Sequence, residues 1–384
     1  MMNFYTAHNK LGILGGGQLG KMLINEANKL NISCKVMDPN KEAPCSNLVE
    51  NFIVGDLLNY DDVYNFGKNV EVLTIEIENV NTDALKKLEE EGVKVYPSSE
   101  NIKTIQNKSV QKNFYLKNNL PSSFFKTYDN VDDLINEAEN KKCNYPFVWK
   151  SARFGYDGKG VKVINNIEDL KTLPNIECII EDKISIKKEL SVIVARNKRS
   201  QEKNFPTVEM EFNQENLVDK VICPAQISDD LNNKAIQLAL KTSRAFNHIG
   251  LLSIELFITD NDEILINEVA PRPHNSGHHT IECCLISQFE QHLRAIFNLN
   301  LGSTSIKIPG IMLNLVGEEK HFGEAIYDNI EGALKIPGAS IHIYGKKDTK
   351  PHRKMGHITI VNKDLNKAKE FAEIIRKSIK VISK

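Results

Sequence analysis

Two glutamates in neighbouring apolar runs are the residues of this sequence best suited to chemistry. A hairpin turn centred between Asn261 and Asp262 would set Glu255 directly opposite Glu268. Like charges at directly opposed positions repel each other, because their Cβ atoms are about 5 Å apart. A divalent cation removes this repulsion, and Mg²⁺ takes one or two carboxylates together with substrate phosphates. We therefore predict a metal site for Mg²⁺ at Glu255 and Glu268, with a displaced register or a solvated strand edge as the alternative.

A stiff polar segment follows Glu268 directly. Two prolines confine its backbone, and it carries Arg272 and Asn275 within a dense set of hydrogen-bond donors. A loop this polar and this constrained is better explained by anion recognition than by packing. Asn267, next to Glu268, can add an oxygen ligand to the metal. We therefore expect this segment to recognise an anion beside the metal site.

The first glycine-rich motif spans residues 15–20, between an apolar run and a helical pattern. Asp38 follows about 20 residues later, as in the fingerprint of dinucleotide-binding proteins. The glycines let an anion approach the backbone, and the N-terminus of a helix favours it. Two interpretations stay open for the motif alone: a nicotinamide dehydrogenase, and a tight turn kept only for packing of the helix on the strand.

The second glycine-rich motif, residues 155–160, lies between two expected strands and follows Lys150. A flexible hairpin tip of this kind can fold over a polyphosphate and shield it from water. The motif lacks the P-loop pattern, and an ordinary hairpin turn is the alternative. A basic cluster at 346–347 and 353–354 is either a further anion site or a solvated charged surface.

Strand and helix patterns divide the chain into three predicted domains, residues 1–100, 101–300 and 301–384. Alternating strands and helices indicate a parallel α/β sheet in the first, with strands at 11–14, 33–37, 70–77 and 93–96 and helices at 21–30 and 83–91. Paired strands indicate an antiparallel α+β second domain, with pairs at 147–150 and 161–164, 178–181 and 190–195, and 252–258 and 263–269, and helices at 107–117, 232–246 and 287–297. The third is expected to have strands at 310–315, 339–344 and 357–361 and a helix at 365–378.

Composition excludes several classes of protein. A formal charge of -1 over 384 residues argues against a polycation that coats nucleic acid. No apolar run approaches the roughly 20 residues that span a bilayer, and residues 1–10 lack the pattern of a signal peptide. The seven cysteines contain no C-x-x-C pair, so buried thiols are expected in place of a disulfide framework or a zinc site. We expect a soluble, cytoplasmic protein that binds neither nucleic acid nor membrane.

The chain resembles the ATP-grasp carboxylate-amine ligases, and among them the 5-(carboxyamino)imidazole ribonucleotide synthases. The motifs that carry the resemblance lie at 15–20, 76–80, 155–160, 267–278 and 353–357, and the match covers residues 11–360. It implies an ATP-grasp fold with an N-terminal Rossmann-like pre-ATP-grasp domain and a small C-terminal α+β domain. Members are usually homodimers, so a homodimer is expected.

The resemblance also implies a reaction. ATP and bicarbonate would give carboxyphosphate, which carboxylates the exocyclic amine of aminoimidazole ribonucleotide in de novo purine biosynthesis, with ADP and phosphate released. ATP and Mg²⁺ would be required, and a separate mutase would act on the product, because the mutase domain that is fused in fungal relatives is not expected here.

By motif, the resemblance assigns a role to individual residues. The ATP-binding residues would be Lys108, Lys150, Gly155, Tyr156, Asp157, Gly158, Lys159, Gly160, Val161, Glu181, Asp182, Lys183, Ile184, Glu189, Asn267 and Glu268. The residues that bind the ribonucleotide would be Gln18, Leu19, Glu76, Glu78, Asp157, Lys159, Lys346 and Arg353. The catalytic residues would be Lys150, Asp157, Lys159, Arg272 and Asn275, with Glu255 and Glu268 as metal ligands.

Three positions depart from the pattern of the family. Ala152 and Phe154 stand where many members have an arginine and a glycine, and Phe212 stands where relatives often have a histidine. Another ATP-grasp enzyme, such as a formate-using transformylase or an acyl-carrier carboxylase, would share the nucleotide site but change Lys346 and Arg353. A nucleotide-binding protein without catalysis is the third alternative, which the retained lysines and carboxylates disfavour.

Overall fold

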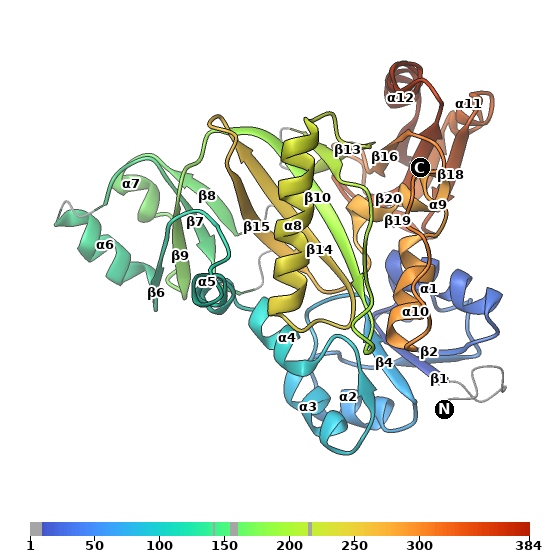
Figure 1. Ribbon diagram of the computed structural model, residues 1–384, viewed down its shortest axis with the longest axis horizontal. Coiled ribbons are helices and arrows are strands. Elements are labelled where there is room, and N and C mark those ends of the chain that lie inside the picture. The colour runs from blue at the N-terminus through green and yellow to red at the C-terminus, as the bar shows by residue number, and fades with distance from the viewer. Residues whose placement is uncertain (1–9, 141–142, 154–159, 214–216) are drawn as a thin grey trace.

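The computed structural model describes residues 10–140, 143–153, 160–213 and 217–384 (Figure 1). Its N-terminal part is a five-stranded sheet in the order β3-β2-β1-β4-β5, with every neighbouring pair parallel, as predicted. The elements of this part are β1 (Lys10–Leu14), α1 (Gln18–Lys29), β2 (Ser33–Asp38), β3 (Asn51–Val54), α2 (Tyr60–Gly67), β4 (Val72–Ile75), α3 (Thr82–Glu90), β5 (Lys94–Val95) and α4 (Ser99–Ile105). The edge strand β3 was not among the expected strands.

The middle of the chain begins with a four-stranded antiparallel sheet, in the order β6-β9-β7-β8. Its elements are α5 (Lys108–Lys117), β6 (Phe125–Tyr128), α6 (Val131–Glu139), β7 (Phe147–Ser151), β8 (Val161–Ile164), α7 (Ile167–Leu170) and β9 (Cys178–Asp182). The predicted pairing of 178–181 with 190–195 is wrong. β9 pairs with β6 and β7, and after residue 185 the chain crosses into a second sheet.

The second antiparallel sheet has nine strands and runs in the order β15-β14-β10-β12-β13-β16-β20-β18, with β11 beside β10. Its first half is built from β10 (Ile186–Arg196), β11 (Glu202–Asn204), β12 (Val208–Phe212), β13 (Val218–Cys223), α8 (Asp229–Ala245), β14 (Gly250–Thr259), β15 (Ile264–Ala270), η1 (Asn275–Gly277), α9 (Thr280–Cys283) and α10 (Gln288–Ile296). β10 and β14 form the longest pairing of this sheet, from Ile186 opposite Thr259 to Arg196 opposite Gly250.

The same sheet continues into the C-terminal part, because β13 pairs with β16. The elements there are β16 (Gly310–Val316), β17 (Gly323–Asp328), α11 (Ile330–Leu334), β18 (Ala339–Ile343), β19 (Asp348–Thr349), β20 (Lys354–Val361), α12 (Leu365–Ser378) and β21 (Lys380–Ser383). No break in the sheet marks the expected domain boundary at residue 300, and the boundaries at 100 and 300 stay predictions.

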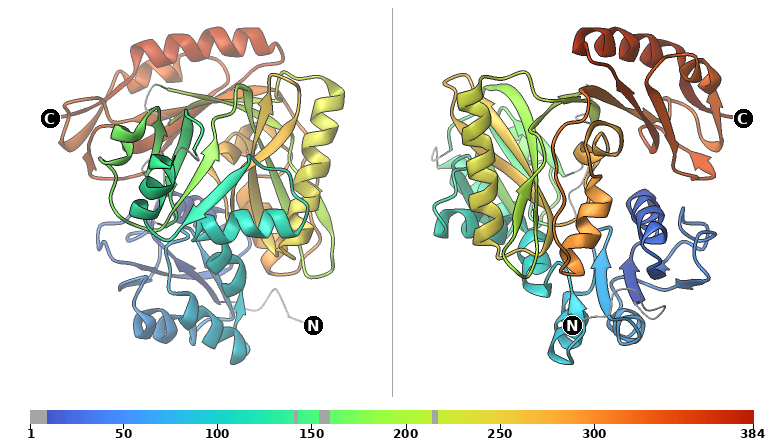
Figure 2. Two further views of the ribbon diagram at one scale, coloured as in Figure 1. Left: turned by 90° about the vertical axis from the view of Figure 1, so that its left-hand side faces the viewer. Right: turned by 45° about the vertical axis from the view of Figure 1, so that its right-hand side comes forward.

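Two helices cover the opposite faces of the β10–β14 region. α8 packs on one face and α10 on the other, as the right-hand view of Figure 2 shows. The apolar side of α10 also contacts α1, with Phe289 and Leu293 in one buried cluster with Leu23 and Ala27. Burial of this apolar surface holds the N-terminal sheet against the middle of the chain.

Buried histidines add polar contacts between the same two parts. His292 on α10 contacts the Thr74 hydroxyl of β4 at 2.9 Å through Nε2, and its Nδ1 accepts from the backbone N–H of Leu251 at 3.2 Å. His248 lies 3.5 Å from the Asn101 side-chain amide of α4. Both imidazoles are fully buried, and burial lowers the pKa of His248 to about 4 and that of His292 to about 3.

The lowered pKa values of these two histidines predict a loss of stability in mild acid. Below the ordinary histidine pKa of 6.5 the unfolded chain binds protons that the folded chain does not, so stability present above pH 6.5 is lost as the pH falls toward 4. Each histidine should lower the free energy of unfolding by about 1.4 kcal/mol per pH unit in this range. Urea denaturation between pH 7.5 and 5 measures the slope. His292→Gln should make it shallower, and an unchanged slope in that variant would contradict the assignment.

No helix among the described residues is long and apolar enough to cross a membrane. Five of the seven cysteines are buried, and all seven carry free thiols, which agrees with the expectation of buried thiols.

Candidate active site

A β-bulge in the β14–β15 hairpin sets the predicted metal ligands together. Ser253 and Ile254 pair with Ala270 and Val269, as expected, but the register then shifts by one and Leu256 pairs with Ile266. The predicted uniform register is therefore wrong between the bulge and the turn. The shift leaves both Asn267 and Glu268 to oppose Glu255, because a bulge places two residues of one strand against one of the other.

The two glutamates of this site differ in exposure and in charge. The Glu255 side chain is 13% exposed, whereas that of Glu268 is 46% exposed and lies 2.8 Å from the Lys108 ammonium group. Burial and the neighbouring charges of Glu268 and Glu189 raise the pKa of Glu255. The ammonium group of Lys108 lowers the pKa of Glu268. The ionised carboxylate of Glu268 thus lies at the mouth of the site. Glu255 lies behind it, and a cation would favour ionisation of its carboxyl group.

The donor set at the bulge fits a hard divalent cation. Asn267 donates through its Nδ2 to Glu255 at 3.4 Å, which leaves the amide oxygen directed to other partners. Carboxylate and amide oxygens suit Mg²⁺, which keeps positions for water and phosphate oxygens. Among the described residues, no three His, Cys, Asp or Glu side chains form a full metal cage. Any cation bound here would therefore take its remaining ligands from the substrate and water.

Three charged side chains converge behind the bulge. Lys150 on β7 lies 3.2 Å from the Glu181 carboxylate of β9 and donates to the Asn267 side-chain oxygen at 3.3 Å. Lys112 on α5 lies 3.2 Å from the same carboxylate. Although burial opposes ionisation of Glu181, the charges of Lys150 and Lys112 lower its pKa. Lys112 was missed by the sequence analysis; its signal is the spacing of four from Lys108, which puts both lysines on one helix face.

The expected nucleotide residues lie around this cluster. Asp182 ends β9, Lys183 and Ile184 follow in the crossing to β10, and burial raises the pKa of Glu189 on β10 to about 7. Lys150 and Val161 are paired in the β7–β8 hairpin, and Gly160 accepts a backbone hydrogen bond from Ser151 at 2.9 Å. The two strands that flank the expected lid are therefore paired, as predicted. The remaining residues assigned to it, Gly155, Tyr156, Asp157, Gly158 and Lys159, lie outside the described residues, as does Phe154.

The first glycine motif is filled by carboxylates of the protein itself. Glu76, directly after β4, accepts hydrogen bonds from the backbone N–H groups of Gly17, Leu19 and Gly20 at 2.9, 3.1 and 3.2 Å. Asp38 accepts from Gly16 at 2.7 Å. A Cβ atom on Gly17 would lie 2.5 Å from the Glu76 carboxylate, so this approach requires glycine. The dinucleotide interpretation is disfavoured, because Glu76 takes the place of the anion at the helix N-terminus.

Arg272, in the polar segment after β15, is held by the N-terminal part of the chain. Its Nε lies 2.8 Å from one carboxylate oxygen of Glu78, and a terminal nitrogen donates to the other at 2.9 Å. Asn275 exchanges two side-chain hydrogen bonds with Asn314 of β16 at 2.8 and 2.9 Å. Both predicted anion-binding side chains are therefore fixed by partners distant in the sequence. Glu78 contacts Arg272, whereas Glu76 caps α1.

The basic cluster of the C-terminal part lies beside the first turns of α1. Lys21 of α1 donates to the carbonyl oxygens of Ile343 and Tyr344 at 3.0 and 3.3 Å. Lys346 donates to the carbonyl oxygen of Lys354 at 2.6 Å, and Arg353 donates to that of Asp348 at 2.6 Å. Gln18 and Leu19 begin α1 on the other side. The start of α1 and the segment after β18, which carry some of the residues expected to bind the ribonucleotide, are thus in contact although they come from opposite ends of the chain.

Two of the family departures have structural roles. The backbone of buried Ala152 accepts from the N–H of Lys108 at 2.8 Å and donates to Glu177 at 2.9 Å, so this position orients the start of α5. Phe212 ends β12 and packs against a buried apolar cluster. Arg153 lies 3.7 Å from Glu177.

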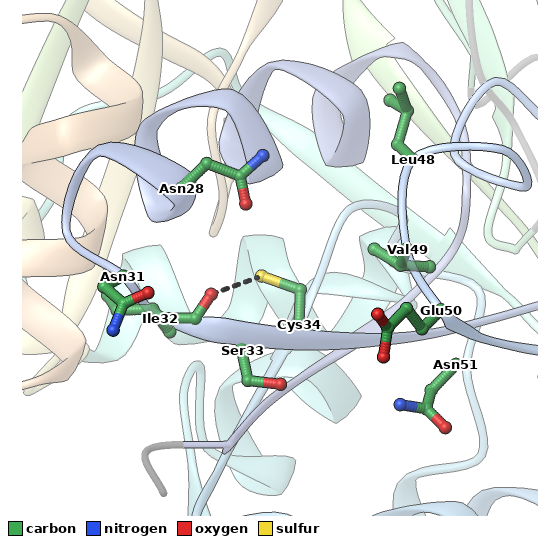
Figure 3. A pocket seen from close by; sticks show the side chains of 9 residues that line it. All are labelled: Asn28, Asn31, Ile32, Ser33, Cys34, Leu48, Val49, Glu50 and Asn51. Atoms are coloured by element: carbon green, nitrogen blue, oxygen red, sulfur yellow. Dashed lines mark hydrogen bonds between the residues drawn. The ribbon is translucent and has the colours of Figure 1, made fainter. Parts of the chain in front are cut away.

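A cavity of about 270 Å³ lies elsewhere, between the end of α1, the start of β2 and residues 48–51 (Figure 3). It opens at the amino ends of the parallel strands. Ligands of open parallel sheets bind at the carboxyl ends, where Glu76 and the glycine motif lie. The cavity therefore lies at the opposite end of the parallel sheet from the glycine motif.

Known protein families match the chain in three segments. The ribonucleotide synthetase preATP-grasp domain matches residues 8–106, the ATP-grasp domain matches 113–289, and the phosphoribosylaminoimidazole carboxylase C-terminal domain matches 310–370. The predicted fold class is thereby confirmed: an ATP-grasp fold preceded by a pre-ATP-grasp domain and followed by a small C-terminal domain.

Individual relatives resemble almost all of the chain. The phosphoribosylaminoimidazole carboxylase of Candida glabrata is 39% identical over 363 residues, which are 91% of this chain but 63% of that protein. The N5-carboxyaminoimidazole ribonucleotide synthase of Bacillus subtilis is 36% identical over 358 residues, 91% of each chain. Among solved structures, the N5-carboxyaminoimidazole synthase of Aspergillus clavatus, in complex with ADP and 5-aminoimidazole ribonucleotide, has a TM-score of 0.87 and 36% identity, and covers 97% of this chain and 98% of its own.

Proposed function

Because the chain belongs to the N5-carboxyaminoimidazole ribonucleotide synthase family of ATP-grasp enzymes, we propose that it carboxylates 5-aminoimidazole ribonucleotide. The reaction uses ATP and bicarbonate, releases ADP and phosphate, and is a step of de novo purine biosynthesis. The observation that carries the proposal is the convergence of Glu255, Asn267 and Glu268 with Lys108 and Lys150 at one bulge.

Phosphoryl transfer comes first in this mechanism. Bicarbonate attacks the γ-phosphate of ATP, which gives carboxyphosphate and ADP. Lys108 and Lys150 lie where they can neutralise phosphate charge, and such positioning and electrostatic stabilisation supply most of the catalysis in phosphoryl transfer. Glu255, Glu268 and the Asn267 oxygen would hold Mg²⁺, which would supply positive charge beside the phosphate groups.

Carboxyphosphate must then be held and kept from water. The Arg272 guanidinium is oriented by Glu78 and the Asn275 amide by Asn314, so neither has to reorganise as charge develops on the intermediate. The exocyclic amine of the ribonucleotide captures the carboxyl group, directly or as released carbon dioxide, and loses a proton. Lid residues over the site would exclude water meanwhile.

The ribonucleotide is proposed to bind between the first turn of α1 and the segment of residues 344–353 that joins β18 to β20, here called the C-terminal loop. Lys346 and Arg353 supply positive charge from the loop, and Gln18 lies in the first turn of α1. Glu76 is proposed to hold that turn in place through its three backbone hydrogen bonds.

Lys346→Ala tests this placement. We expect the KM for the ribonucleotide to rise about 10- to 100-fold, the effect of losing one charge-assisted hydrogen bond, while the KM for ATP stays within a factor of about two. Steady-state kinetics with each substrate varied in turn measures both. The exposed Lys350, on the same loop, provides the matched control Lys350→Ala. Equal changes in the two KM values would count against the assignment of Lys346.

The reaction is tested by ADP release from MgATP and bicarbonate, with and without the ribonucleotide, and by incorporation of labelled bicarbonate into an acid-labile carboxyl group. Strong stimulation together with incorporation supports the proposal. ATP turnover that ignores the ribonucleotide would instead indicate another acceptor, as in a different ATP-grasp enzyme.

The proposal extends to the assembly and the pathway. We also propose that the protein is a cytoplasmic homodimer and that a separate mutase acts on its product. Mass measurement in solution tests the dimer, and conversion of the released product by an added mutase tests the second point.

A further inference from the structure

A buried network of two lysines and one glutamate holds one more positive charge than negative. Its members are Lys112, Glu181 and Lys150. We propose that Lys112 is a positioning residue that keeps Glu181 neutralised when Lys150 turns from that carboxylate to a phosphate group of the bound nucleotide. The inference rests on the proposed function for the nucleotide site, and deepens it by assigning a role to a residue that the motifs do not include.

Lys112 is fixed to Glu181 by contacts that a nucleotide would not disturb. Its side chain is 2% exposed, and that of Glu181 is 4% exposed. The ammonium group lies 3.2 Å from one oxygen of Glu181 and donates to the Ser123 hydroxyl at 3.1 Å. Ser123 in turn donates to the other oxygen of Glu181 at 2.7 Å. These three residues form a closed ring of contacts from α5, the segment before β6, and β9.

Lys150 occupies the opposite side of the carboxylate, toward the metal site. Its side chain is 13% exposed, and its ammonium group is 3.2 Å from both oxygens of Glu181 and 3.3 Å from the Asn267 oxygen. Asn267 contacts Glu255 at the bulge. Lys150 therefore links the buried ring to the residues that are proposed to face the nucleotide.

The electrostatics require a second counter-ion for Glu181. An ionised carboxylate left buried without a partner is strongly unfavourable, so Lys150 could not leave Glu181 if it were the sole cation beside it. Burial lowers the pKa of Lys112 to about 8, while the charge of Glu181 acts to keep it protonated.

A purely structural role for Lys112 predicts a different result from a role in freeing Lys150 to turn toward a phosphate group. If Lys112 only stabilises the fold, its replacement lowers stability and leaves nucleotide affinity unchanged. If Lys112 frees Lys150, replacement of Lys112 ties Lys150 to Glu181 and weakens nucleotide binding. Removal of the Glu181 charge should then abolish this effect of replacing Lys112. The effect of a second substitution therefore separates the two roles.

The test is a double-mutant cycle of Lys112→Met, Glu181→Gln and the double variant, with Lys117→Met, at an exposed position of the same helix, as the matched control. Calorimetric binding of MgADP and the KM for ATP and for the ribonucleotide are measured in the full chain. We expect Lys112→Met to weaken MgADP binding and raise the KM for ATP about tenfold, a typical coupling within one charge network. The KM for the ribonucleotide should not change, and in the Glu181→Gln background Lys112→Met should cause no further loss of MgADP affinity.

Two outcomes would overturn the inference: MgADP affinity of Lys112→Met equal to that of Lys117→Met, or a loss on Lys112→Met that is as large in the Glu181→Gln background as in the wild type. Should Lys112→Met fail to fold, two other variants decide: Lys112→Arg, which keeps the charge, should bind MgADP nearly as wild type does, and the double variant should bind it as Glu181→Gln does. Wild-type protein that binds MgADP but shows no ribonucleotide-dependent ADP release would contradict the proposed function alone, because the binding cycle does not depend on the acceptor.

Discussion

Glu268→Gln is expected to lower Mg²⁺-dependent ADP release about 10²- to 10³-fold, the usual cost of removing one preorganised charge from a phosphoryl-transfer site. The amide retains the shape of the side chain but takes away the ionised ligand at the mouth of the site. Glu255 alone leaves a bound cation with one carboxylate of the protein where the wild-type site offers two. The loss should fall mainly on kcat and on the Mg²⁺ concentration needed for half-maximal rate.

The fold of this variant should survive. The substitution removes the charge of Glu268, which opposes ionisation of the buried Glu255, and this relieves repulsion at the bulge. Lys108 loses its partner at 2.8 Å, but the carboxylates of Glu181 and Glu255 still act on it. Thermal unfolding checks this, with Glu263→Gln, exposed just before β15, as the control. Turnover above about a tenth of the wild-type rate would contradict the assignment of Glu268 as a metal ligand.

Arg272→Lys is expected to reduce kcat for carboxylation of the ribonucleotide about 10²-fold while the KM for ATP changes little. A guanidinium can bind Glu78 through two nitrogens and still present a further N–H to carboxyphosphate, whereas a lysine has one ammonium group and no fixed fork. In this protein Nε and one terminal nitrogen contact Glu78. The lysine variant should therefore hydrolyse ATP without efficient transfer of the carboxyl group.

The ratio of ADP released to carboxyl group incorporated measures this uncoupling. Glu78→Gln should show a weaker form of it, because Arg272 keeps its charge but loses its orientation. Arg244→Lys is the control, since Arg244 makes a similar ion pair with Glu202 at the surface. A wild-type ratio in Arg272→Lys would show that the guanidinium does not act on the intermediate.

Local sequence patterns were sufficient for most elements of the fold. The apolar run and helical spacing around residues 15–20 predict a strand and a helix, and β1 and α1 lie there. The helix at 365–378 and the hairpin strands β14 and β15 also agree with expectation. These elements follow from periodicity, because each buries a face whose residues are close in the sequence. The pairing of β9 with β10 failed, since adjacency along the chain does not decide which sheet a strand joins.

For the candidate site, residue types and motifs alone indicated the metal-ligand pair, the lysines at 108 and 150, and the polar segment after β15. They could not indicate the bulge, because the position of the turn does not by itself fix the register of the two strands. The register also depends on packing of both sheet faces. Nor could they separate Glu76 from Glu78, which are two residues apart. One caps α1 and the other binds Arg272, 194 residues away.

The sequence by itself determined the fold class, the family and the chemical types at the site. Only the tertiary structure decided how charges are distributed there: Glu76 fills the helix N-terminus, Lys112 lies buried on Glu181, and one sheet continues from β13 into β16. The physical reason is that burial and Coulomb interactions depend on separation in space, and these partners are tens of residues apart along the chain.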